Sequence, residues 1–233
     1  MKKQAIFSAV SLLAPLFIGS SVMADTNSSN SANTSVAANF TVSSTDSTNP
    51  TPPGGNVDPS NPGEKPNPGN TELNPSGRFA LSYIPYQFNF GTTEISGNSP
   101  ISVAATPASG KTFNVGVKNT THTSAGWTLS ASLTGDLATM YSAEITTTTT
   151  QANAKLNDGG TLKDLPTSNM ITVTPNAKIG ATSSTIMTGN KGNVFAGTYD
   201  IDLGAINLKI PDASKIPTGN ISGNVNWNLV QAP

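Results

Sequence analysis

The sequence has no cysteine, one histidine and only 11% charged residues among its 233 positions. Without cysteine there can be no disulfide framework, no thiolate zinc site, no cysteine nucleophile and no lipid anchor on a cysteine. One histidine excludes a metal site built from several histidines. The formal net charge of −1 provides no strongly basic chain to neutralise nucleic-acid phosphates. We therefore expect no metal, no cofactor and no nucleic-acid partner.

Residues 1–24 are typical of a secretory signal peptide. Lys2 and Lys3 give a positive start, an apolar stretch ends near Ile18, and Val22-Met23-Ala24 puts small residues at the positions that precede cleavage. The apolar stretch is short for a membrane span, and no second one follows. We expect a secreted mature chain without a membrane span. Since neither a sortase-type signal nor a lipid-accepting cysteine is seen, attachment to a cell surface would be non-covalent.

Residues 25–77 are dominated by Ser, Thr, Asn, Pro and Gly. Such a composition offers too little apolar surface to offset the entropy of an ordered chain. We therefore expect a disordered tail and linker over this stretch. Prolines in its second half favour extended polyproline II conformation, which suits a spacer.

Residues 78–233 have the period-two apolar pattern of β-strands. Trp127, Leu129, Ala131 and Leu133 alternate with Thr and Ser, and the segment 221–229 alternates apolar residues with Asn. Turn residues separate these runs, and no long amphipathic helix is evident. The pattern predicts an all-β domain, either an antiparallel sandwich or a barrel-like fold.

Residues that could carry catalysis are few. Asp200 and Asp202 share one strand face, a pairing that can bind calcium or serve a glycosidase. The simpler interpretation is a solvated polar face, and we favour it. Asp158-Gly159-Gly160 is typical of a turn, and His122 lies in a Thr-rich stretch without a nucleophile elbow. We expect no enzyme, and a glycan-active enzyme ranks last among the alternatives.

The two tryptophans of the domain occur in the same short sequence motif. Trp127 is followed by Leu129 and Trp227 by Leu229, so each gives Trp-x-Leu, and the second motif leads to Ala232-Pro233. With this pair of motifs, residues 78–233 resemble the WxL-domain cell-surface proteins of low-GC Gram-positive bacteria. In that family the C-terminal motif reads Tyr-x-x-x-Leu-x-Trp-x-Leu-x-x-Ala-Pro.

Two positions depart from that motif. Ile221 stands in place of the tyrosine and Val225 in place of the first leucine, and both remain apolar. The resemblance implies a non-enzymatic domain that attaches non-covalently to the cell wall, with peptidoglycan or another wall polymer as ligand and other wall-associated proteins as possible partners. An adhesin or complex subunit that binds a protein, such as a host matrix component, is the alternative.

The resemblance also names candidate binding residues without deciding their role. They are the motif positions Trp127, Leu129, Trp227, Leu229, Ala232 and Pro233. Indole faces can pack on the C–H faces of sugar rings, while Asn and Thr bond to hydroxyls and amides. However, both tryptophans share a strand face with aliphatic residues, and such aromatics are usually buried. Wall contact and a core role both stay open from the sequence.

Overall fold

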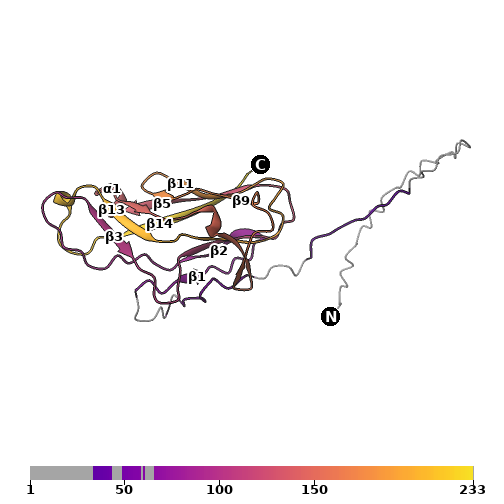
Figure 1. Cartoon of the computed structure of the whole chain (residues 1–233), viewed down its shortest axis with the longest axis horizontal. Helices are drawn as coiled ribbons and strands as arrows, with labels where there is room; N and C mark the ends of the chain where they lie inside the picture. Colours follow the sequence, from indigo (N-terminus) through magenta and orange to yellow (C-terminus); the bar gives the residue numbers. More distant parts are fainter. Residues whose placement is uncertain (1–33, 44–48, 59, 61–65, 233) are drawn as a thin grey trace, which may run out of the picture. The chain divides into compact units, whose positions relative to one another are not determined.

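The computed structural model of the chain describes residues 34–43, 49–58, 60 and 66–232 (Figure 1). The chain divides into two units, residues 1–40 and residues 41–233. In the first unit, residues 34–40 form neither helix nor strand, and their side chains are exposed. The predicted signal peptide lies outside the described residues. Every helix and strand of the described residues belongs to the second unit.

The described residues of the second unit form fourteen strands in three sheets. The six-stranded sheet has the order β1 (Asn70–Glu72), β2 (Phe79–Pro85), β4 (Asn114–Asn119), β12 (Gly197–Asp202), β7 (Ala154–Asp158) and β8 (Thr161–Lys163). The β13 sheet has the order β10 (Lys178–Ile179), β6 (Glu144–Thr146), β13 (Ile206–Ile210) and β3 (Ile101–Ala105). The β14 sheet has the order β14 (Gly223–Gln231), β5 (Trp127–Gly135), β11 (Ser184–Gly189) and β9 (Ile171–Val173).

All neighbouring strands in these sheets run antiparallel. In the part of the chain that the structure describes, helical structure is limited to three short pieces, α1 (Asp136–Thr139), η1 (Gln151–Asn153) and η2 (Ala213–Lys215). The predicted all-β antiparallel fold is confirmed. No helix within the described residues is long and apolar enough to cross a membrane.

A single apolar core lies between the three sheets. Its buried members include Val115 and Val117 from β4, Ile145 from β6, and Leu129 and Leu133 from β5. Strand β5 buries every second residue, because successive side chains of a strand point to opposite faces. The apolar face of each strand is thus used as the sequence pattern predicted.

The folded domain begins earlier than the sequence analysis placed it, because two stretches of the Pro- and Gly-rich segment pack on the six-stranded sheet. Residues 66–69 lead into β1, residues 70–72, which pairs with β2. Residues 49–57 are tied down by hydrogen bonds, among them one from the Asn157 amide to the Thr51 carbonyl at 2.8 Å. We call residues 49–57 and 66–72 the N-terminal cover. The prediction that residues 25–77 are disordered throughout is wrong for this cover.

Candidate functional site

The two Trp-x-Leu motifs lie side by side on neighbouring strands. Strands β5 and β14 pair over nine residues without a bulge, and Leu129 stands opposite Leu229 in this register. Trp127 pairs with Gln231, and Trp227 pairs with Ala131, so the two indoles lie at different heights along the ribbon. The structure therefore brings together two motifs that are 100 positions apart in the sequence.

Trp127 is a core residue. Its side chain is fully buried, and its ring lies 5.7 Å from the ring of Tyr199 between centroids. The indole also lies against Gly189, where an added Cβ would come within 2.2 Å of the ring. The indole N–H has no hydrogen-bond partner. A fully buried indole cannot contact a wall polymer, so its contribution is to packing.

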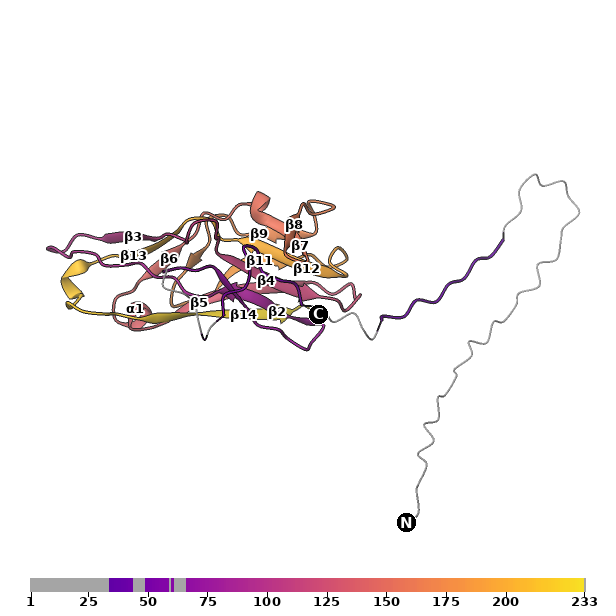
Figure 2. The same cartoon turned by 90° about the horizontal axis from the view of Figure 1, so that it is seen from below.

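Trp227 occupies a different environment from Trp127, although both stand in a Trp-x-Leu motif. It lies in β14, which forms the edge of its sheet (Figure 2). Its side chain is half-buried. The difference follows from position in the sheet: β5 has a partner on each side, whereas β14 has β5 alone.

The remaining motif residues have structural contacts. Leu129 is fully buried and Leu229 half-buried. The backbone N–H of Ala232 donates to the carbonyl of Gly126 at 2.7 Å, which extends the contact between β14 and the start of β5. Pro233 lies outside the described residues. The second motif therefore holds β14, the last strand, against β5, the strand that carries the first motif.

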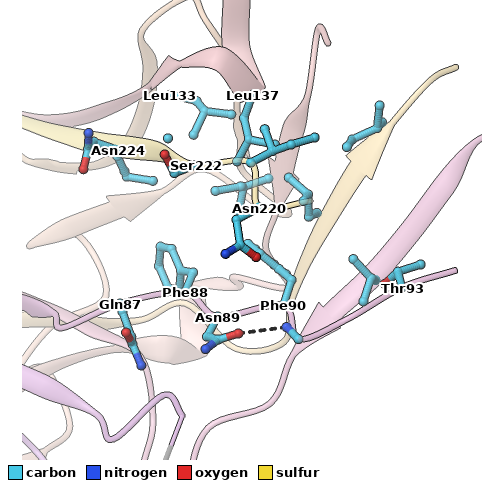
Figure 3. Close-up of a pocket in the computed structure, with 18 of the residues that line it drawn as sticks. Gln87, Phe88, Asn89, Phe90, Thr93, Leu133, Leu137, Asn220, Ser222 and Asn224 are labelled. Carbon is cyan, nitrogen blue, oxygen red and sulfur yellow. Dashed lines mark hydrogen bonds between the residues drawn. The ribbon is translucent and has the colours of Figure 1, made fainter. Parts of the chain in front are cut away.

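Beside β14 lies a cleft of about 660 Å³, lined by apolar and polar residues in similar measure. Trp227 and Val225 line it from β14, and Leu133 lines it from β5. Figure 3 shows Phe88 and Phe90 across the cleft from Leu133 and Leu137, with the amide of Asn220 between them. The cleft exposes part of the core that the β14 and β13 sheets would otherwise enclose.

The outer face of the β14 sheet, opposite the core, carries only uncharged polar groups with one exposed valine. From β14 it presents Asn224, Asn226, Asn228 and Val230. From the strands beyond, it presents Thr128, Ser130, Ser132 and Thr134 of β5, Thr185 and Thr188 of β11, and Thr172 of β9. We call this surface the Asn/Ser/Thr face. None of the four strands contains Asp, Glu, Lys, Arg or His.

A hydrogen-bonded polar cluster lies buried between the N-terminal cover and the six-stranded sheet. Tyr83 lies over Gly116, and its hydroxyl donates to Asp200 Oδ1 at 2.7 Å. The amide of Asn114 donates to the other carboxylate oxygen of Asp200 at 2.9 Å. The amide of Asn157 donates to the Tyr83 hydroxyl at 3.0 Å. Sequence reasoning missed this cluster because its members are scattered between positions 83 and 200.

The interpretation of Asp200 as part of a solvated face is wrong, since its side chain is fully buried. Burial raises the pKa of Asp200 to about 7, and Asp202 adds to the rise, while the bonds from Tyr83 and Asn114 oppose it. Burial likewise raises the pKa of Tyr83 far above its ordinary value. Asp202 is half-buried and accepts a bond from the N–H of Gly204 at 2.9 Å, so the two carboxylates do not form a shared site.

The other residues singled out from the sequence do not converge. His122 is exposed in a loop, and its backbone N–H donates to the carbonyl of Phe195. Asp158 is exposed and forms an ion pair with Lys163, which lowers the pKa of this carboxyl. Within the described part of the chain, no group of three or more His, Cys, Asp or Glu could hold a metal ion.

Comparison with known families decides what these motifs belong to. A family model described as the WxL domain, surface cell wall-binding, matches residues 28–233. The chain belongs to the WxL family. WxL is a family of cell-wall-binding surface domains and not an enzyme family, so this protein is a cell-surface, wall-associated one. Neither the curated proteins nor the solved structures gave a match to the WxL chain.

Proposed function

We propose that this WxL protein is exported through residues 1–24 and attaches without a covalent link to the peptidoglycan of a Gram-positive wall. We assign the attachment to the Asn/Ser/Thr face. The observation that carries this proposal is the absence of charge from all four strands of the β14 sheet, in a domain whose other sheets contain lysines and acids.

The chemistry of this face favours a neutral glycan. Side-chain amides both donate and accept hydrogen bonds, and hydroxyls do the same, which matches sugar hydroxyl and acetamido groups. An anionic wall polymer such as teichoic acid would instead require a positive surface. The exposed asparagines Asn224, Asn226 and Asn228 alternate along one edge strand, so they form a row that an extended polymer can follow.

In this proposal the Trp-x-Leu residues support the Asn/Ser/Thr face by packing beneath it. Trp127, Leu129 and Leu229 pack under it and hold β14 in register with β5. Trp227, half-buried at the edge, contributes to the same support. Replacing these residues would reduce wall binding through loss of the flat sheet, without any of them touching the polymer.

The test removes the amide row and leaves the packing intact. A triple variant with Asn224→Ala, Asn226→Ala and Asn228→Ala alters exposed side chains alone. Loss of three hydrogen-bonding groups should weaken retention on purified insoluble peptidoglycan by roughly tenfold or more. The matched control is Asn98→Ala, Asn169→Ala and Asn220→Ala, which removes three exposed amides elsewhere, one of them in the cleft.

The polymer preparation separates the ligand classes. Protease-treated peptidoglycan stripped of teichoic acid should bind as well as the intact wall. Because the face carries no charge, added salt should change binding little. Folded protein that stays in the supernatant with this preparation, or a triple variant that binds as the control does, would refute the assignment. Binding that requires intact wall protein would favour the adhesin or complex-subunit alternative.

A further inference from the structure

The outer edge of β14 is unusually open to another strand. Within the described residues, β14 pairs with β5 along one edge and with no strand along the other. It is nine residues long, Gly223–Gln231, and keeps a continuous register with β5. Proteins usually protect such edges with charged residues, proline, bulges or short length. β14 has none of these protections, so its free N–H and C=O groups offer a template for strand addition.

Apolar surface lies directly beside this edge. Val225, Trp227 and Leu229 point inward from β14 but remain half-buried, and the first two line the cleft. The far side of the cleft includes Phe88, Ile101 and Ile210, from outside the β14 sheet. A further strand beside β14 would place alternate side chains over this opening. A strand that fits this opening would have apolar residues at every second position.

The chain itself contains such a strand pattern. In the segment Ser35–Ser43, the apolar side chains Val36, Ala38, Phe40 and Val42 alternate with Ala37, Asn39 and Thr41. Val36 and Phe40 are each 90% exposed, which is costly for large apolar side chains that pack on nothing. The segment has no charge and no proline, and its nine residues equal the length of β14.

We propose that segment Ser35–Ser43 of one copy adds as a strand to the free edge of β14 in a second copy. Val36 and Phe40 have exposed side chains, and the outer edge of β14 has no partner strand among the described residues. Each copy therefore supplies one donor segment and one acceptor edge, which satisfy each other when they meet between molecules. Backbone hydrogen bonds supply affinity in this mode of recognition, and alternate side chains supply specificity.

Side-chain size fixes a register for this pair. In an antiparallel arrangement with Ala38 opposite Trp227, the small residue lies beside the large one. Phe40 then lies opposite Val225, and Val42 opposite Gly223. The other side of the donor strand, with Asn39 and Thr41, continues the uncharged Asn/Ser/Thr face.

Each copy carries one donor and one acceptor, so the contact is heterologous and generates chains or closed rings. Several Asn/Ser/Thr faces would then meet one wall together, and such multivalency raises overall avidity without new contacts.

The first experiment uses a pair of adjacent substitutions in the chain from residue 25 onward. Phe40→Asp places a charge on the inward side, whereas Asn39→Asp places the same charge on the outward side. Light scattering after size-exclusion chromatography should find concentration-dependent assemblies for the unaltered chain. Phe40→Asp should weaken assembly at least about tenfold, and Asn39→Asp by much less. Equal effects of the two substitutions would contradict the proposed orientation.

The second experiment identifies the acceptor, aided by the absence of native cysteine. In the proposed register, Asn39 of the donor lies opposite Asn226 of the acceptor, and both point outward. Mixing a chain with Asn39→Cys and a chain with Asn226→Cys under mild oxidation should give a disulfide-linked heterodimer. A chain with both substitutions that cross-links only within itself would overturn the intermolecular contact. So would an unaltered chain that is monomeric at every concentration.

Discussion

The buried carboxyl of Asp200 should make the stability of the domain depend on pH in a direction opposite to that of a salt-bridged aspartate. The pKa of Asp200 is about 7 in the folded domain, compared with an ordinary value of 3.8. The folded state therefore binds a proton that the unfolded chain has released between these two values. Linkage then requires the free energy of unfolding to fall as the pH rises through this window, and to level off above about pH 7.

The size of the effect follows from the shift. About three pKa units correspond to on the order of 4 kcal/mol between the two ends of the window. Replacing Asp200 by Asn removes the titrating group from the buried cluster while keeping its shape. The variant should lose the pH dependence across the window. Its stability should be offset at every pH by the same amount, because the amide nitrogen of Asn cannot accept the bond that one of the two carboxylate oxygens accepts.

Urea unfolding followed by tryptophan fluorescence, at a series of pH values from about 4 to 8, measures the difference between the two proteins. The exposed carboxyls of Asp158, Asp164 and Asp212, whose pKa values are lowered by hydrogen bonds and nearby lysines, cancel in this difference. Tyr83→Phe supplies a check: it removes a bond that lowers the pKa of Asp200, so the window should extend to higher pH. Stability curves of Asp200→Asn and unaltered protein that run parallel would refute the reasoning.

Three further predictions concern packing and domain boundaries. Iodide should quench the fluorescence of Trp227 in a Trp127→Phe variant, but quench Trp127 hardly at all in a Trp227→Phe variant; equal quenching would contradict the assigned burial. Gly189→Ala should destabilise the domain by roughly 1–3 kcal/mol, because the added methyl collides with the buried indole of Trp127. Urea unfolding measures the loss, and an unchanged unfolding midpoint would show that the ring can move. In calorimetry, a chain that begins at Asn49 should melt cooperatively. A chain that begins at Arg78 should melt at a clearly lower temperature, because it lacks β1 and the N-terminal cover over the polar cluster. Equal melting temperatures would count against this domain boundary.

Much of the sheet architecture could be read from residue alternation. The pattern Trp127, Leu129, Ala131, Leu133 predicted a strand with one buried face, and β5 has that strand and that face. The pattern ending at Leu229 did the same for β14. Alternation of this kind reports which side of a strand is apolar, because neighbouring side chains point to opposite faces. It also predicted that the asparagines of β14 share the side opposite its apolar residues, and in the folded domain that side is exposed.

The exposure of each motif residue depended on neighbours that the local sequence does not name. Trp127 and Trp227 have the same Trp-x-Leu frame, yet one is fully buried and the other half-buried, because β5 lies inside the sheet and β14 at its edge. The burial of Asp200, a polar residue, was likewise not predictable from its local sequence. Its alternation with Tyr199 and Ile201 suggested a solvated face, but the N-terminal cover lies over that face and encloses the carboxyl.

The sequence by itself therefore determined the strands, their apolar and polar sides, and the family signature carried by two Trp-x-Leu motifs. The tertiary structure alone decided that these motifs pair, that an uncharged face crosses four strands, and that a cleft opens beside the last one. The physical reason is that side-chain alternation is a local property of the backbone. Burial and partnership arise instead from contacts between segments far apart in the chain, and these exist only once the sheets have assembled.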